Sequence, residues 1–161
     1  NVLEAEKKIY TTLIDYEERK KDVLIAADVS ALEAITTKEQ LAGDELIACS
    51  NKQIQILKDI AVVLGRNDGK MTVTRLISLL DTQPDVQKQL TESRDSLLEA
   101  ANQMKSLSDQ NAILIRQAIE LNEFDMTLFK SLRQAPETAN YDRSAYNTGS
   151  LLGGGGFDAT S

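Results

Sequence analysis

Residues 84–133 read PDVQKQLTESRDSLLEAANQMKSLSDQNAILIRQAIELNEFDMTLFKSLR, and this stretch decides the fold class. It has no glycine and no further proline, and Leu, Ala, Gln, Glu and Lys recur along it, so it favours one helix. Pro84 suits the first turn because its missing amide proton would have no partner inside the helix. Such a helix has about 50 residues and is about 75 Å long. Its apolar stripe comprises Leu97, Ala101, Met104, Leu107, Leu114, Ala118, Leu121, Leu128 and Leu132, with Asn111 as a polar member.

The segment before residue 84 is also expected to be helical. It contains only three glycines, Gly43, Gly65 and Gly69, and no proline, which favours helix over strand or loop. A first long helix is predicted from about Val2 to Ala27. One face of it carries Val2, Ile9, Leu13, Tyr16, Val23 and Ala27, with Lys20 as a polar interruption.

The connection after this helix contains two capping signals. Asp28 is predicted to be the N-cap of a short helix over residues 29–35. Thr36 and Glu39 then have the spacing of a capping box, in which the hydroxyl and the carboxylate each accept from a main-chain amide. We therefore expect a second long helix to begin near Thr37.

This second long helix is expected to run to Leu64 and to end at Gly65 in a left-handed conformation. Thr72 is predicted to cap a short helix that continues through Leu80. The second long helix has an apolar seam of heptad spacing. It is formed by Ala42, Leu46, Cys49, Gln53, Ile56, Ile60 and Val63.

Three long helices with short links should pack antiparallel at the shallow angles of coiled coils. The sequence therefore predicts an all-α fold, an elongated antiparallel bundle of three long helices with short connecting helices. We expect Asn111 to fix the register of the bundle, as polar residues in such seams often do. The bundle domain spans residues 1–133, and residues 134–161 form a flexible C-terminal tail rich in Gly, Ser, Thr and Asn.

Composition argues against several function classes. The 161 residues carry a formal net charge of −7, whereas a nucleic-acid binder needs a basic stripe. The run RKK at residues 19–21 follows two glutamates and is expected to be a solvated helix face. No apolar stretch approaches the ~18–20 residues that would span a bilayer, so we expect no membrane insertion and a cytoplasmic protein.

The sequence also contains no pattern that indicates a catalytic or metal-binding site. The chain has no histidine and one cysteine, Cys49, which lies on an apolar stripe. The stretch GRNDGKMT at residues 65–72 departs from the phosphate-loop spacing and is expected to be a turn. The seams are apolar, so paired buried carboxylates are not expected. We predict no enzyme activity, no cofactor and no metal.

The second half of the last helix is the strongest candidate for a binding surface. The first two long helices are about half its length, so residues after about Ala112 should lack a full-length neighbour. A helix that is apolar over a wide arc must be buried by something. That could be self-association or the short helices, or it could be an amphipathic helix of a partner. The candidate contact residues are Ile115, Ile119, Phe124, Met126, Phe129 and Leu132.

Several stretches together resemble the FlgN family of flagellar type III export chaperones. They are YTTLIDYEERKKDVLIAADVSALEAITTKEQ at residues 10–40, TVTRLISLL at 72–80 and LSDQNAILIRQAIELNEF at 107–124. The resemblance covers roughly residues 10–150. It implies a cytoplasmic chaperone that binds the C-terminal helical region of hook-associated, or hook–filament junction, proteins and delivers them to the export gate. It also implies that cargo binds the C-terminal portion of the chain.

The resemblance further implies that a tyrosine shortly after the last helix docks to the export gate protein. Tyr141 and Tyr146 are both candidates. Large amphipathic rings on a flexible arm suit reversible recognition. The final stretch LLGGGGFDATS at residues 151–161 departs from the family pattern. Two alternatives are a structural coiled-coil homo-oligomer joined through the apolar end of the last helix, and a helical secretion chaperone for another cargo such as the filament cap.

Overall fold

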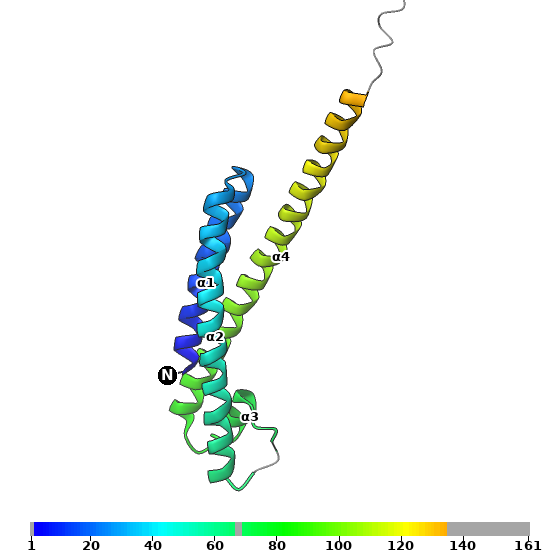
Figure 1. The fold of residues 1–161 in the computed structure, drawn as a ribbon. Coiled ribbons are helices and arrows are strands. Elements are labelled where there is room, and N and C mark those ends of the chain that lie inside the picture. Colours follow the sequence, from blue (N-terminus) through cyan, green and yellow to red (C-terminus); the bar gives the residue numbers. More distant parts are fainter. Residues whose placement is uncertain (1, 67–68, 135–161) are drawn as a thin grey trace, which may run out of the picture. The chain divides into compact units, whose positions relative to one another are not determined.

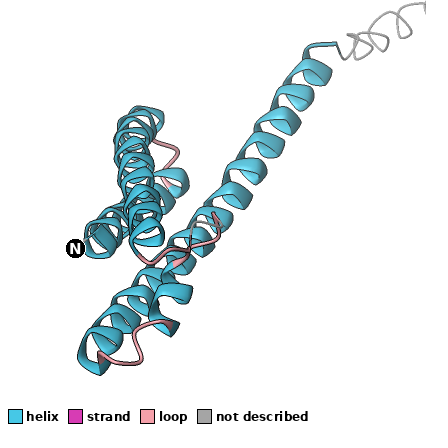
Figure 2. Ribbon diagram, turned by 90° about the horizontal axis from the view of Figure 1, so that it is seen from below, coloured by secondary structure: helices cyan, strands magenta, loops and turns pink. Residues whose placement is uncertain are grey.

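The computed structural model describes residues 2–66 and 69–134, and within these residues it is helical with no strand (Figures 1 and 2). The helices are α1 (Val2–Ile25), α2 (Val29–Val63), α3 (Val73–Ser78) and α4 (Pro84–Gln134). The predicted all-α class, with three long helices and a short connecting helix, is confirmed. The chain divides into two units, Asn1–Ile119 and Glu120–Ser161, so α4 belongs to both. The predicted tail spans residues 134–161; Gln134 is the last residue of α4, and residues 135–161 lie outside the described residues.

A tight turn joins α1 to α2. The amides of Ala27 and Asp28 donate to the carbonyls of Leu24 and Val23, each at 3.2 Å, which is the Schellman pattern that closes a helix. Ala27 takes the left-handed conformation in this motif, with φ of 53°. Asp28 then caps α2, because its Oδ1 accepts from the amide of Ala31 at 2.9 Å. The prediction of Asp28 as an N-cap is confirmed.

The start of α2 differs from the expectation. Two predictions were wrong here: a separate helix over residues 29–35 and the start of a new helix near Thr37. The structure has one helix, α2, that runs without a break from Val29 to Val63. The hydroxyls of Thr36 and Thr37 do not cap. They donate to the carbonyls four residues earlier, at 2.8 and 3.0 Å, a bond available to Thr inside a helix.

The other helix ends follow the predicted signals. Gly65 is left-handed, with φ of 63°, and its amide donates to Val62 while that of Arg66 donates to Ala61. Thr72 caps α3 by accepting from the amide of Arg75 at 3.1 Å. The Schellman motif at Gly65 and the Thr72 cap set the ends of the connection between α2 and α3.

Within the first unit, α1 and α2 are antiparallel and form the closely packed helix pair. The thiol of Cys49 donates to the carbonyl of Val2, 3.8 Å away, at one end of the pair. At the other end, Lys20 forms an ion pair with Glu39. The first part of α4 runs parallel to α1, since Ser93 donates to Glu4 and Asn111 donates to Glu17.

The buried faces are partly shifted from the predicted ones. On α1, Leu3, Glu6, Leu13, Ile14 and Glu17 are buried, and only Leu13 among these was predicted. On α2, Ile56 and Val63 are exposed, and Ala61 is buried in their place. The few buried apolar residues of the described chain are alanines or lie on α1. They are Leu3, Leu13, Ile14, Ala42, Ala61 and Ala100.

Candidate functional site

The last turns of α4 expose large apolar side chains. Phe124 and Phe129 are 64% and 65% exposed. The set of exposed apolar residues is called the apolar end of α4 below. It comprises Ile119, Leu121, Phe124, Met126, Leu128, Phe129 and Leu132.

Five of the six candidate contact residues belong to this set. The sixth, Ile115, is half-buried. Leu121 and Leu128 were part of the predicted stripe and are exposed with the others. The expectation that this stretch lacks a full-length neighbour agrees with these exposures.

The apolar end of α4 is wide as well as exposed. Leu121, Leu128 and Leu132 continue the three-and-four spacing of the stripe that begins at Leu97. Met126 and Phe129 lie on one side of that row. At 100° per residue the whole set covers about 220° of the helix circumference, which is wider than the stripe that one neighbouring helix covers.

A polar cluster, defined as Glu17, Lys20, Glu39 and Asn111, joins three helices in the first unit. The Asn111 Nδ2 donates to both the carbonyl oxygen and Oε2 of Glu17, each at 2.7 Å. The Lys20 Nζ lies 3.5 Å from Glu17 Oε2 and also pairs with Glu39 Oε2. Asn111 therefore holds α4 against α1, in agreement with its predicted role in register.

Two expectations about these charges were wrong. The side chain of Lys20 is only 13% exposed, so it is not part of a solvated face, although its neighbours Arg19 and Lys21 are exposed. The seams also contain buried carboxylates. Strict heptad spacing could have revealed them, because α1 turns one side toward its partners every three or four residues. That side carries Leu3, Glu6, Tyr10, Leu13, Glu17, Lys20 and Leu24.

Burial raises the pKa of Glu39 above its ordinary value, and the Glu17 carboxylate adds to this effect. The ammonium group of Lys20 opposes it through a hydrogen bond and charge attraction. Glu39 Oε1 is buried without a hydrogen-bond partner. The cluster therefore links α1, α2 and α4 and contains one unsatisfied oxygen.

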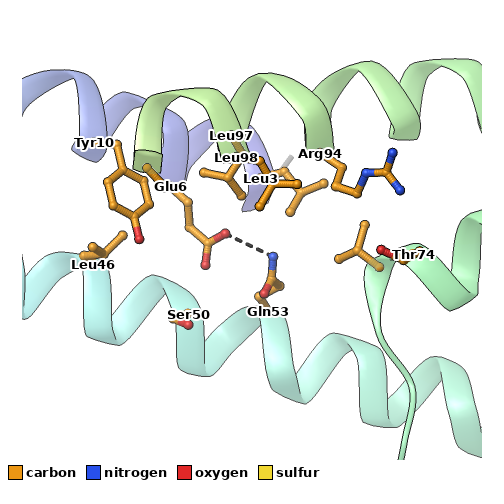
Figure 3. Close-up of a pocket in the computed structure, with 12 residues that line it drawn as sticks. Leu3, Glu6, Tyr10, Leu46, Ser50, Gln53, Thr74, Arg94, Leu97 and Leu98 are labelled. Atoms are coloured by element: carbon orange, nitrogen blue, oxygen red, sulfur yellow. Dashed lines mark hydrogen bonds between the residues drawn. The ribbon is translucent and has the colours of Figure 1, made fainter. Parts of the chain in front are cut away.

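A pocket of 340 Å³ lies between α1, α2, α3 and α4 (Figure 3). Four of its twelve lining residues are leucines, and the buried residue Glu6 also lines it. The Gln53 Nε2 donates to Glu6 Oε2 at 3.0 Å. Burial raises the pKa of Glu6. This pocket was not predicted from the sequence, in which the heptad position of Glu6 is its only signal.

The described residues show neither a metal site nor a membrane-spanning helix. No group of three Asp, Glu, Cys or His side chains within them is arranged to hold a metal ion. Among the same residues, no helix is long and apolar enough to cross a membrane. The two tyrosines suggested for docking, Tyr141 and Tyr146, lie outside the described residues.

A comparison with known families gives a match along most of the chain. The family model described as FlgN protein matches residues 1–148. No curated protein and no solved structure matches the chain. The match includes the apolar end of α4 and both tyrosines, and it ends before the glycine-rich stretch at residues 151–161. The chain belongs to the FlgN family of flagellar export chaperones.

Proposed function

We propose that this chain binds the C-terminal helical region of hook–filament junction proteins in the cytoplasm. It keeps them unassembled and delivers them to the type III export gate. The observation that carries the proposal is the apolar end of α4, where seven large apolar side chains are at least 45% exposed. A contiguous apolar surface of this kind marks an interaction site in a soluble protein.

The size of this surface fits a reversible complex. Fully burying a Leu, Phe or Met side chain contributes about 1.5–3 kcal/mol. About half of each side chain here remains to be covered, so each contributes roughly 1 kcal/mol. Association entropy and side-chain ordering oppose the sum. The net affinity is therefore modest, which suits a chaperone that must release its cargo.

Within this surface, Phe124, Met126 and Phe129 are the proposed anchors. Aromatic side chains contribute most at interface centres, and Met adapts to differently shaped partners. Ile115, Ile119 and Leu132 extend the contact along α4. Ile115 is half-buried and would contribute least.

Docking to the export gate is assigned to Tyr141 or Tyr146. Both follow α4 in a polar stretch that has no apolar period of its own. A Tyr141→Ala/Tyr146→Ala variant should bind cargo as the parent does but lose affinity for the gate protein. Unchanged binding to the gate protein would remove this part of the proposal.

The cargo proposal is tested by calorimetric titration with C-terminal peptides of the junction proteins from the same organism. We expect saturable one-to-one binding, weakened at least about tenfold in Phe124→Ala/Phe129→Ala. The matched control is Ile47→Ala/Val62→Ala, which removes two apolar side chains of similar exposure from α2. Its affinity should equal that of the parent.

The same surface would also fit a second copy of the chain in a structural homo-oligomer. Sedimentation at two protein concentrations separates the two functions. A tight oligomer that Phe124→Ala/Phe129→Ala dissolves, together with no binding of either peptide, would contradict the chaperone proposal. Binding of a filament-cap peptide in place of the junction peptides would assign another cargo.

A further inference from the structure

The pocket beside Glu6 has the character of a binding site. Its volume of 340 Å³ is within the range of sites for small ligands and side chains. It is partly open to solvent, and all the residues that line it belong to the first unit. Its apolar walls are formed by Leu3, Leu46, Val73, Leu97, Leu98 and Ala101.

Glu6 is the notable group in this pocket. The residue is only 4% exposed, and its side chain extends from α1 toward α2 across the pocket (Figure 3). Oε2 accepts the hydrogen bond from Gln53, whereas Oε1 accepts none from the described residues. A carboxylate that accepts one hydrogen bond keeps acceptor capacity for a further donor, and a cationic donor forms the stronger bond.

The basic residue that lines the pocket does not supply that cation. Arg94 donates to Asp95 Oδ1 through Nε at 2.9 Å and through Nη2 at 2.6 Å. Figure 3 shows its guanidinium group directed away from Glu6. None of the ion pairs found among the described residues includes Glu6.

Hydroxyl groups are also available beside this carboxylate. Tyr10 and Ser50 line the same pocket, from α1 and α2 respectively. A planar group with several donors could bond to Glu6 Oε1 and still have donors for other oxygens that line the pocket. Arginine has this geometry, whereas lysine presents a compact ammonium group.

We propose that this pocket binds an arginine side chain of a partner polypeptide, with the aliphatic stem against the leucines and the guanidinium on Glu6 Oε1. The apolar walls match the methylene groups of the stem, which arginine commonly buries while its head stays polar. The net charge of −7 favours the approach of a cationic segment. This contact is separate from the apolar end of α4 and does not depend on the identity of the cargo.

The first test uses N-acetyl-arginine N-methylamide as the probe and its citrulline analogue as the neutral match. Both are titrated into the full chain while the main-chain amide NMR signals of Ser50 and Gln53 are followed. The arginine probe should bind at least about tenfold more tightly than the citrulline probe. Equal affinities, or no change at either amide, would overturn the proposal.

Two variants that make the same charge change sharpen the test. Glu6→Gln keeps an acceptor for Gln53 but removes the charge, so the preference for arginine over citrulline should disappear. Glu18→Gln makes the same change at an exposed position of α1 and should keep the preference. A preference that survives in Glu6→Gln, or that is lost equally in both variants, would refute the assignment to this pocket.

A pH series on the unmodified chain gives a test that needs no variant. Glu6, Tyr10 and Arg94 are the titratable groups that line the pocket. Because burial raises the pKa of Glu6, the affinity for the arginine probe should fall as the pH is lowered through the pKa of that carboxyl group. The affinity for citrulline should stay constant. Parallel curves for the two probes would contradict a role for Glu6.

Discussion

Replacing Lys20 with methionine should destabilise the first unit strongly at neutral pH. Lys20 is the only cation of the polar cluster, and it lies between two carboxylates. The side chains of Lys20 and Glu39 are 13% and 14% exposed. Removing one partner of a buried ion pair costs about 3–5 kcal/mol because the other charge stays buried. Because both side chains keep some contact with water, we expect the loss in the free energy of unfolding to lie near the lower limit of this range, about 3 kcal/mol.

The assay is urea unfolding followed by helical circular dichroism at pH 7 and at pH 5. The control is Lys21→Met, which makes the same change at the exposed neighbouring position and should alter the free energy of unfolding by less than about 0.5 kcal/mol. Adding Glu39→Gln to Lys20→Met should recover part of the loss, because one of the two carboxylate charges left without Lys20 is then gone.

The pH dependence of Lys20→Met has a definite sign. The pKa of Glu39 is already raised above its ordinary value by burial, and losing the Lys20 ammonium raises it further. The folded state then binds the proton more tightly than the unfolded state does. Protonation therefore stabilises the fold, and this stability is lost as the pH rises through the folded pKa. The deficit of Lys20→Met should be smaller at pH 5 than at pH 7. A loss within about 1 kcal/mol of the Lys21→Met control at pH 7 would refute the reasoning.

Three further substitutions should change the free energy of unfolding, each measured by the same urea titration. Asn111→Ala removes the donor to Glu17 Oε2. It should lower the free energy of unfolding by about 1.5–3 kcal/mol, since the acceptor is charged and buried. A loss below about 0.5 kcal/mol would contradict the contact. Ala27→Gly relieves the left-handed conformation at φ of 53° and should stabilise by up to about 1 kcal/mol, whereas a net loss would contradict that backbone geometry. Asp28→Ala removes the cap that bonds to Ala31 and should cost about 1 kcal/mol, so an unchanged midpoint would speak against the cap.

The helix ends show which local signals could be predicted from the sequence. Four residues set helix ends through the conformation or hydrogen bonds of main-chain groups within a few residues, so their effect does not depend on the rest of the fold. They are Asp28, Gly65, Thr72 and Pro84. Each has the predicted role. Helix ends of this kind are decided by amide and carbonyl groups that no intrahelical bond satisfies.

The start of α2 and the polar cluster depend on contacts between distant residues. The Thr36–Glu39 pattern satisfies the capping-box spacing, yet Glu39 is held by Lys20 on another helix. Glu17 likewise meets Asn111, 94 positions later in the chain. Local spacing cannot show such pairings. A search for the strict three-and-four spacing on α1 would still have placed Glu6, Glu17 and Lys20 on the face that turns toward α2 and α4.

The exposed end of α4 was predicted from helix lengths, because α1 and α2 are too short to cover a helix of 51 residues. This argument needs only the rise per residue and the short connections. The pocket beside Glu6 was not predicted, since it depends on side chains from four helices.

The central claim is that the apolar end of α4 binds cargo, and hydrogen–deuterium exchange on the whole chain tests it most directly. Adding a junction-protein C-terminal peptide should slow exchange in the α4 segment 115–132 and leave the segment 29–63 unchanged. A control at higher chain concentration without peptide should show no such protection. Protection that appears in this control as strongly as with peptide, or that falls on α1 and α2 and not on α4, would contradict the account.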